Sequence, residues 1–264
     1  MQTSRTEIHC LLLFTIISYV QGWCLKTQFR VADKVRSIDY SFDGSMIGVG
    51  ADGNSLRVYD AYTYNLKHTF SSSGDPLALS FNPLGTYLVS GNHDGTMTFA
   101  NLLTGASNVA NSNHTCVFSI DFSNNSNQMV SCGKDQDIKI WDSSNWPITL
   151  SANATGSISN DMRGCVWTAD NKIITADSAG VVRILNSPYS LASLFGTART
   201  YGGGANISHI SNRYNTYDYT VADGSGSKKG WHSNDTATPV YSVSQSVFAT
   251  SYAYSLDYFM FGGS

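Results

Sequence analysis

The clearest strand pattern in the chain lies between residues 114 and 142, where short apolar runs alternate with polar turns. Val117, Ile120 and Phe122 give the first run one apolar face, which is typical of a half-buried strand. Two further runs follow, and each is bounded by a polar or glycine-containing turn. The pattern therefore predicts three short antiparallel strands: 117–122, 128–132 and 138–141.

The same pattern returns along the chain with a period of about 40 residues. One marker lies near the end of the first strand of each unit, with two early steps of 41 residues: Tyr40, Phe81, Phe122, Trp167, Asn212 and Gln245. A second marker, at the end of the third strand, keeps step with it: Tyr59-Asp60, Ala100-Asn101, Trp141-Asp142, Leu185-Asn186 and Trp231-His232. Two markers in step indicate a repeat architecture with six first strands.

Glycine-containing turns join the strands of the early repeats. Asp43-Gly44 and Leu84-Gly85 lie between first and second strands, whereas Asp52-Gly53 and Asp94-Gly95 lie between second and third strands. Glycine tolerates the positive φ that tight hairpins require. Asp52, Asp94 and Asp135 all lie in turns of this second kind, so we interpret them as turn residues rather than metal ligands.

Three short strands that end in Trp-Asp resemble one blade of the WD-repeat β-propeller family. In that family a histidine before the first strand, a serine in the second strand, an aspartate in the next turn and the tryptophan form one hydrogen-bonded set. The resemblance places this structural set at His114, Ser131, Asp135 and Trp141. It implies an all-β fold, a β-propeller whose blades have four antiparallel strands.

The resemblance also implies how the ring closes. An open propeller would leave a sheet edge prone to pairing with other chains. In the family, an N-terminal segment supplies the missing outer strand of the last blade, and the alternating segment 25–31 lies just before the first repeat. We expect six blades closed in this way, with seven blades as the alternative.

The N-terminus has the pattern of an export signal. A polar start that contains Arg5 precedes the apolar run 10–20, and small residues near Gly22 favour cleavage after it. The run is shorter than the roughly 20 residues that span a bilayer as a helix. We therefore predict a signal peptide at 1–22 and a single propeller domain at 23–264. The alternative is that the apolar run forms a buried strand.

Two further features bear on export. Sequons for N-glycosylation occur in or next to predicted loops: Asn113, Asn124, Asn153, Asn206 and Asn234. Removal of the signal leaves four cysteines, which allow three disulfide pairings but also suit core positions as free thiols: Cys24, Cys116, Cys132 and Cys165.

Charge and site chemistry narrow the range of functions. Charged residues make up 13% of the chain, the net charge is -3, and no basic run exceeds Lys228-Lys229. Binding of nucleic acid through a basic face is therefore not expected. The six histidines show no metal-ligand spacing. We expect no catalytic residue, metal or cofactor, and a propeller hydrolase that uses Asp161 and Asp223 is the less favoured alternative.

A propeller presents loops at both ends of its central channel. In WD-repeat proteins, partners most often bind the face formed by the loops that enter each first strand and those that join second to third strands. The resemblance maps this candidate partner face onto the following residues: Lys34, Asp75, Asn92, His93, Asn113, Lys134, Asp161, Ser178 and Pro239.

The expected function is a non-enzymatic scaffold that binds other proteins, delivered to the secretory pathway as a secreted or surface component. The alternative is a cytosolic or nuclear WD-repeat adaptor. Segments 239–243 and 247–251 resemble blades of the mitotic-checkpoint and mRNA-export group, which favours that alternative.

Overall fold

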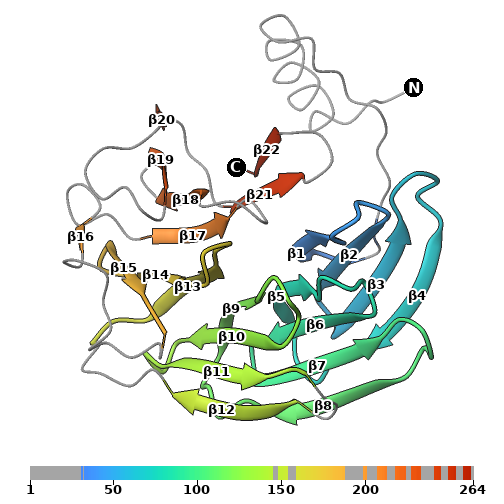
Figure 1. The fold of residues 1–264 in the computed structure, drawn as a ribbon. Coiled ribbons are helices and arrows are strands. Elements are labelled where there is room, and N and C mark those ends of the chain that lie inside the picture. The colour runs from blue at the N-terminus through green and yellow to red at the C-terminus, as the bar shows by residue number, and fades with distance from the viewer. Residues whose placement is uncertain are drawn as a thin grey trace, which may run out of the picture. The chain divides into compact units, whose positions relative to one another are not determined.

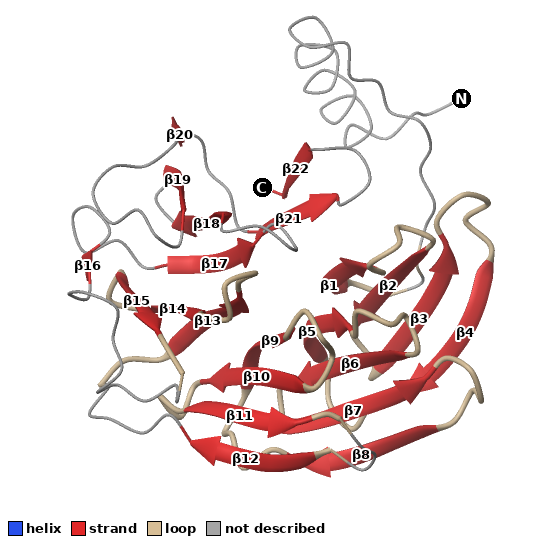
Figure 2. Ribbon diagram, in the orientation of Figure 1, coloured by secondary structure: helices blue, strands red, loops and turns tan. Residues whose placement is uncertain are grey.

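The computed structural model describes residues 31, 33–144, 148–153, 159–187, 199–200, 207–212, 218–223, 227–232, 241–244, 249–253 and 258–262. Within these residues the chain forms 22 strands and no helix (Figures 1 and 2). All of the strands belong to one compact unit, residues 33–264. The predicted all-β class is confirmed.

Five four-stranded antiparallel sheets follow one another, and in each the strands pair in chain order. The first sheet comprises β1 (Val35–Tyr40), β2 (Met46–Ala51), β3 (Ser55–Asp60) and β4 (Leu66–Ser71). The second comprises β5 (Pro76–Phe81), β6 (Tyr87–Asn92), β7 (Thr96–Asn101) and β8 (Ser107–Asn111). The third comprises β9 (Val117–Phe122), β10 (Gln128–Gly133), β11 (Ile138–Asp142) and β12 (Thr149–Asn153).

The later sheets have the same order. The fourth sheet comprises β13 (Met162–Trp167), β14 (Ile173–Asp177), β15 (Val181–Leu185) and β16 (Arg199–Thr200). The fifth comprises β17 (Ile207–Asn212), β18 (Asp218–Asp223), β19 (Ser227–His232) and β20 (Tyr241–Ser244). A sixth sheet contains two described strands, β21 (Ala249–Ala253) and β22 (Tyr258–Gly262).

The glycine turns have the conformation that their sequence predicts. The glycines that follow Asp43, Asp52, Leu84 and Asp94 all have positive φ, between 66° and 80°: Gly44, Gly53, Gly85 and Gly95. Because an L side chain is disfavoured at such φ values, these glycines determine where each strand pair can turn.

Successive sheets pack through their first strands. The strands β1, β5, β9, β13, β17 and β21 contact one another in chain order. The fourth strands β4, β8 and β12 lie on the outer side of the first three sheets (Figure 1). The first strands thus lie at the centre of the packing, and the fourth strands of the first three sheets lie at its margin.

Small residues allow this close approach between sheets. A methyl group added to Gly91 of β6 would lie 2.8 Å from Cβ of Val117 and 2.9 Å from Cδ1 of Ile120, both on the next first strand. A methyl group on Gly50 of β2 would likewise lie 2.7 Å from Cβ of Pro76. These separations are too short for real carbon contacts, so glycine is required where the next sheet packs most closely.

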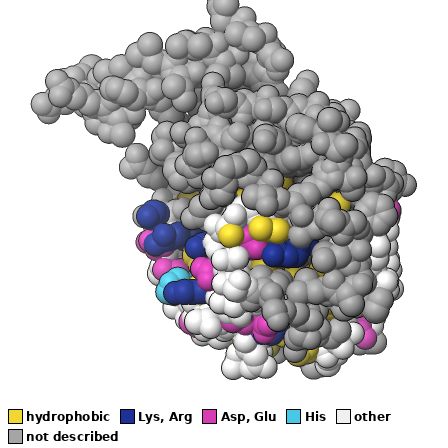
Figure 3. Space-filling model, turned by 90° about the vertical axis from the view of Figure 1, so that its left-hand side faces the viewer, with side chains coloured by type: hydrophobic (Ala, Val, Ile, Leu, Met, Phe, Trp, Pro, Cys, Tyr) yellow, Lys and Arg dark blue, Asp and Glu magenta, His cyan; other side chains and the backbone are white. Residues whose placement is uncertain are grey.

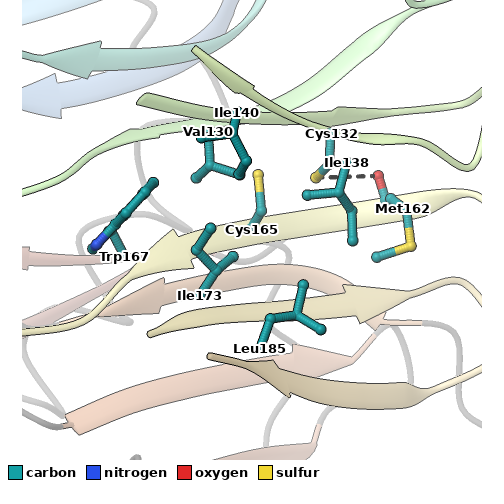
Figure 4. Close-up of a cluster of buried hydrophobic side chains, with 9 residues drawn as sticks. All are labelled: Val130, Cys132, Ile138, Ile140, Met162, Cys165, Trp167, Ile173 and Leu185. Atoms are coloured by element: carbon teal, nitrogen blue, oxygen red, sulfur yellow. Dashed lines mark hydrogen bonds between the residues drawn. The ribbon is translucent and has the colours of Figure 1, made fainter. Parts of the chain in front are cut away.

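The contact between the third and fourth sheets is a buried apolar cluster (Figure 4). It draws side chains from β10, β11, β13, β14 and β15: Val130, Cys132, Ile138, Ile140, Met162, Cys165, Trp167, Ile173 and Leu185. Removing such side chains from water is the main favourable term in the packing of one sheet on the next.

The first sheet differs from the third in the exposure of the apolar residues on its first strand. Val117 and Ile120 are buried against the second sheet, but the corresponding residues of β1, Val35 and Ile38, are 45% and 48% exposed. This apolar face of the first sheet is therefore open to solvent.

The structure corrects the predicted position of the sixth repeat. The sequence pattern placed its first strand around Val240 and Val243, with Gln245 as the marker. Instead, β20 pairs with β19 as the fourth strand of the fifth sheet, and the next first strand is β21. In β21, Ala249 pairs with Gly262 as Ala78 pairs with Gly91, so the marker position is Tyr252. The predicted signal peptide at 1–22 and residues 25–30 of the predicted closing strand lie outside the described residues.

Candidate functional site

A chain of hydrogen bonds runs through the third sheet from an aspartate to a tryptophan. His114 Nδ1 lies 2.7 Å from Asp135 Oδ1, and His114 Nε2 lies 2.8 Å from Ser131 Oγ. Trp141 Nε1 donates to the same Ser131 Oγ at 2.9 Å. Because the carboxylate can only accept, His114 Nδ1 carries the proton, and Nε2 accepts from the Ser131 hydroxyl. All four residues that the sequence resemblance singled out are joined in this one set.

The set has the connectivity of a Ser-His-Asp catalytic triad but not the accessibility of one. Ser131 is fully buried, and its hydroxyl already donates to His114 and accepts from Trp141. A nucleophile must reach a bound substrate, and this hydroxyl has no free approach. The arrangement therefore ties the strands of one sheet together.

Lys139 is a fifth member of the set, and it was not predicted from the sequence. Its Nζ donates to the carbonyl oxygen of Asn113 at 2.6 Å and to Asp135 Oδ2 at 3.1 Å, and its side chain is only 3% exposed. One sequence signal could have found it, since Lys139 lies four residues after Asp135. In the structure it pairs directly with Ser131 in the sheet.

The pKa values of Asp135 and His114 are both lowered, but for different reasons. Burial alone would raise the pKa of Asp135, but hydrogen bonds and positive charge from His114 and Lys139 hold it below its ordinary value. Burial lowers the pKa of His114, and Asp135 offsets only part of this effect. His114 is consequently neutral at neutral pH, and the buried ion pair is the one between Asp135 and Lys139.

Other sheets replace this set with different polar groups. In the second sheet, the Asn92 amide donates to Thr98 Oγ1 at 3.0 Å and accepts from Ser90 Oγ at 2.9 Å. In the fourth sheet, Asp177 accepts from Arg183 at 2.7 Å. Asn92 belongs to the predicted partner face, but its side chain is fully buried and is used within its own sheet.

The backbone holds the candidate partner face together. In each of the first four sheets, the turn after the second strand donates to the loop before the first strand. The bonds run from Asp52 N to Lys34 O (2.9 Å), His93 N to Asp75 O (3.0 Å), Lys134 N to Cys116 O (3.0 Å) and Ser178 N to Asp161 O (2.9 Å). The two kinds of loop predicted to form one face therefore do lie together.

The side chains predicted for this face differ in availability. Lys34, His93, Asn113 and Lys134 are exposed, and Asp75, Asp161 and Ser178 are partly exposed. Pro239 lies outside the described residues. Figure 3 looks onto the side where β10 ends and β11 begins, and positive and negative side chains gather there next to one another.

Several charges on this face are paired within the chain. Arg36 forms an ion pair with Asp52, and Arg163 pairs with Asp161 at 3.2 Å. The Arg163 guanidinium also lies 4.6 Å from the centre of the Phe118 ring, which is a cation–π distance. Asp161, a carboxylate considered for a hydrolase, is thus engaged by a neighbouring arginine. Asp223 lies in β18, and the structure does not describe its side chain.

Asp94, the remaining aspartate of the turns between second and third strands, has hydrogen-bond partners within its own turn. Asp94 accepts from the backbone and hydroxyl of Thr96 at 3.0 Å and 2.6 Å. The described part of the chain contains no group of three or more histidine, cysteine, aspartate or glutamate residues arranged to hold a metal ion. In the same part of the chain, no helix is long and apolar enough to cross a membrane.

Exposed apolar side chains mark the opposite face, formed by the turns between first and second strands and between third and fourth strands. Tyr62, Leu84 and Leu103 lie in such turns of the first two sheets and are 69%, 74% and 77% exposed. The sequence places Leu84 in a turn but does not mark any of the three as exposed, because one apolar residue in a turn carries no periodic signal.

Two partly buried carboxyl groups link successive first strands. Asp39 of β1 accepts from the backbone N–H of Phe81 at 3.1 Å, and Asp121 of β9 accepts from the backbone N–H of Trp167 at 2.6 Å. Burial raises the pKa of both carboxyl groups to about 7, although the hydrogen bonds act in the opposite direction. The charge of Asp39 adds to the rise for Asp121.

Replacing these carboxyl groups is expected to change how stability depends on pH. In the folded chain each group keeps its proton up to about pH 7, but in the unfolded chain only up to about pH 4. The contribution of these two groups to the free energy of unfolding therefore falls as the pH rises from 4 to 7. Asp121→Asn should match the parent protein near pH 4 and exceed its stability by about 1–2 kcal/mol above pH 7, a figure reduced for the partial exposure.

Urea denaturation across this pH range measures the effect. Asp43→Asn is a control of opposite sign, because hydrogen bonds from Ser41 and Ser45 outweigh the effect of burial and lower the pKa of Asp43. That variant should lose relative stability as the pH rises. Parallel curves for Asp121→Asn and the parent protein would show that Asp121 ionises normally.

Comparison with known proteins finds WD repeats in the sequence and the same fold in solved structures. The family model described as "WD domain, G-beta repeat" matches three stretches: 22–60, 64–99 and 107–142. The chain is 30% identical over 148 residues to a WD repeat-containing protein 91 homolog of Dictyostelium discoideum, over 50% of this chain and 19% of that protein. It is 37% identical over 67 residues to Protein ANTHESIS POMOTING FACTOR 1 of Arabidopsis thaliana, over 24% of this chain and 20% of that protein.

Solved structures show the same fold at low sequence identity. A chain of a mitotic checkpoint complex superimposes with a TM-score of 0.69 at 14% identity, over 85% of this chain and 70% of that chain. The structure of U3-55K superimposes with a TM-score of 0.74 at 14% identity, over 89% of this chain and 76% of that chain. The chain spans about a fifth of the length of the two curated relatives, so their whole activities do not carry over to it.

Proposed function

The chain belongs to the WD-repeat family and has a β-propeller fold, and from this premise we propose that it is a non-enzymatic scaffold of the secretory pathway or cell surface that binds other proteins. WD-repeat proteins generally act as protein-interaction scaffolds. The observation that carries the proposal is the candidate partner face, whose loops are held in place by backbone hydrogen bonds within each sheet. Loops positioned by a rigid scaffold are the usual location of binding residues.

The chemistry of this face fits a polypeptide partner. Exposed lysines and partly exposed aspartates lie close together on it, so it has no dominant charge of one sign. Mixed charge of this kind favours recognition through specific polar contacts over attraction to a polyanion. In the described residues, the triad-like set is buried, and Asp161 is paired with Arg163. The face thus offers contacts to bind a partner rather than groups to transform a substrate.

Charge reversal on the candidate partner face tests the proposal. A double variant, Lys34→Glu with Lys134→Glu, changes two exposed side chains in loops of the first and third sheets. Lys67→Glu, on the outer strand β4, is the matched control. Quantitative affinity purification from the native source should lose the same proteins with the double variant and retain them with the control.

Three results would overturn the proposal. If the double variant retains the whole set of captured proteins, the candidate partner face is not the binding face. If Leu84→Ser with Leu103→Ser removes that set instead, the partner binds the opposite face, where these side chains are exposed. A capture that never exceeds the background of an unrelated protein would contradict the scaffold itself.

Export to the secretory pathway is supported by two observations. The first WD-repeat match begins at residue 22, where the proposed signal peptide ends, so residues 1–21 lie outside the repeats. The sequon Asn113-His114-Thr115 has both an exposed asparagine and an exposed threonine. These features suit a chain that loses its first 22 residues and is open to glycosylation.

The mature N-terminus and the glycan state are expected to agree. Sequencing of protein from its source should find Trp23 first, and peptide N-glycosidase should reduce the mass of the parent chain. Asn113→Gln should remove the part of that mass change that comes from this sequon. A mature chain that still begins near Met1 and carries no N-glycan would contradict export.

A cytosolic or nuclear adaptor is the second candidate. The observation that favours it is the likeness to a chain of a mitotic checkpoint complex. This version keeps the same binding face but predicts an uncleaved N-terminus, so the sequencing experiment distinguishes the two.

A further inference from the structure

Cys132 and Cys165 occupy facing positions in the contact between the third and fourth sheets. Comparison of the strand register with that of the second sheet shows that they face each other. Ser119 pairs with Cys132 as Ala78 pairs with Gly91, so Cys132 takes the place that Gly91 has in the sheet before. A methyl group on Gly91 would touch Ile120, the fourth residue of the next first strand. Cys165 is the fourth residue of β13, so it faces Cys132.

The environment of the two thiols agrees with this placement. Both are fully buried within the same apolar cluster, where Figure 4 shows their sulfur atoms between β10 and β13. Cys132 Sγ lies 3.7 Å from the carbonyl oxygen of Met162, and Cys165 Sγ lies 3.6 Å from that of Ser119. Each thiol thus contacts the strand that carries the other. Burial, followed by a hydrogen bond with Cys165, raises the pKa of the Cys132 thiol well above its usual range.

We propose that Cys132 and Cys165 form a disulfide that joins the third and fourth sheets when the chain folds in the presence of a disulfide oxidant. Both thiols are free in the structure, which therefore represents the reduced form. A thiolate of one cysteine attacks the oxidant RSSR and releases RS⁻, which takes up a proton. The second thiolate then attacks the mixed disulfide and releases the second RSH. Two protein thiols lose two electrons and two protons, and RSSR is reduced to two RSH.

Burial determines when the step can occur. Exchange needs a thiolate that the oxidant can reach, and the folded sheets provide neither exposure nor a low thiol pKa. The bond therefore forms during folding, before the cluster closes around the thiols. Once formed, it is shielded from reductants by the same packing. Export to an oxidising compartment would supply the oxidant, but the inference itself concerns the chain in any compartment.

Cys116 provides an internal comparison. It is also free and buried, but it lies before β9, and its carbonyl oxygen accepts from the Lys134 backbone. Neither the register nor the cluster places a second cysteine opposite it. Selectivity for the pair Cys132–Cys165 over any pair with Cys116 is thus a consequence of the fold.

Oxidative refolding of the full-length chain tests the proposal. The reduced, unfolded chain is refolded with a mixture of oxidised and reduced glutathione, or with excess reductant alone. The oxidised sample should lose about 2 Da, since two hydrogen atoms leave, and peptide mapping should find Cys132 joined to Cys165. Cys116→Ala should retain this bond, and Cys132→Ala should abolish it. The melting temperature should rise by about 5–10 °C, because the bond closes a long loop.

The order of treatment gives a second, independent readout. Oxidised glutathione added to the already folded, reduced chain should form the bond at least tenfold more slowly than it forms during refolding. A glutathione adduct at Cys132, a bond to Cys116, or no mass change on refolding would each overturn the proposal. A bond that forms in vitro while the pair stays reduced in cells leaves this inference intact and argues against the secretory location.

Discussion

Replacing Asp135 by alanine is expected to lower the free energy of unfolding by about 3–5 kcal/mol. The reason is the charge left behind. Lys139 Nζ is 3.1 Å from the Asp135 carboxylate, and its side chain is 3% exposed, so it loses its nearer counter-ion without gaining water and keeps only the exposed Asp137 carboxylate, 3.9 Å away. His114 Nδ1 also loses its acceptor, because the carboxylate is its partner at 2.7 Å. Urea or thermal denaturation followed by circular dichroism measures the loss.

A double variant separates the charge from the rest of the set. Asp135→Ala with Lys139→Met removes both members of the ion pair and leaves no buried charge. It should recover a large part of the stability lost in Asp135→Ala, because a buried ion pair and an apolar replacement of similar volume are often close in energy. If the double variant is as unstable as the sum of the two single variants, the uncompensated charge is not the cause.

The same set predicts loss of stability in acid. The pKa of Asp135 is lowered in the folded chain, so its contribution is present above the unfolded value near 4 and is lost as the pH falls through the folded value. The pKa of His114 is also lowered, so acid favours the unfolded chain, in which the imidazole can take a proton. The contribution of Asp135 and His114 to the stability of the parent protein should therefore shrink below about pH 6, and Asp135→Ala should lose less stability than the parent protein over the same range.

Replacing Gly95 by alanine is expected to cost about 3–4 kcal/mol, whereas the same change at Gly53 should cost about 1 kcal/mol. The two glycines occupy the same turn in successive sheets, with φ values of 80° and 74°. A methyl group on Gly95 would overlap the carbonyl oxygen of His114, but on Gly53 it would meet no atom within 4 Å. A backbone carbonyl cannot move aside as a flexible side chain can.

The stability lost in Gly53→Ala thus measures the backbone strain alone. The additional loss in Gly95→Ala measures the steric overlap of the new methyl group with the carbonyl oxygen of His114. The test is the change in melting temperature of each variant under identical conditions. Equal losses at the two positions would show that φ alone decides, and that the approach of His114 to the turn has no energetic weight.

Much of the third sheet could be predicted from the sequence, because several of its characteristic residues lie close together along the chain. Trp141-Asp142 ends a strand, Asp135 lies in a tight turn, and Ser131 lies ten residues before the tryptophan. Each of these features is defined within one hairpin, so spacing alone is enough to place it. Lys139 escaped notice because it lies between two isoleucines, where a charged residue suggests the solvent side of a strand. In the structure both sides of this strand are buried.

In the later repeats, the alternation of apolar and polar residues did not suffice to assign the strands. Residues 240–243 alternate as a first strand would, but residues 241–243 belong to the fourth strand of the fifth sheet. A first strand at the centre of a propeller and a fourth strand at its margin can have the same alternating pattern. Alternation of apolar and polar residues indicates only that one face of the strand is buried, not which strand of the sheet it is. The register of Ala249 with Gly262 resolves the ambiguity, and that pairing depends on contacts between distant segments. The exposure of Leu84 and Leu103 depends on the packing of whole sheets and has no sequence period.

The glycine contacts between sheets also limit how the repeats can be rearranged. Gly50 accommodates Pro76, Gly91 accommodates Val117, and Gly164 accommodates Ile210. Each sheet is thus complementary in size to the neighbour that follows it, although the strands of all sheets look alike. Shuffling would break these matches: with the second sheet replaced by a copy of the third, a cysteine side chain would meet Val117 in place of a bare glycine. The repeats are consequently not interchangeable modules, and a chimaera of this family must exchange both sides of a junction together.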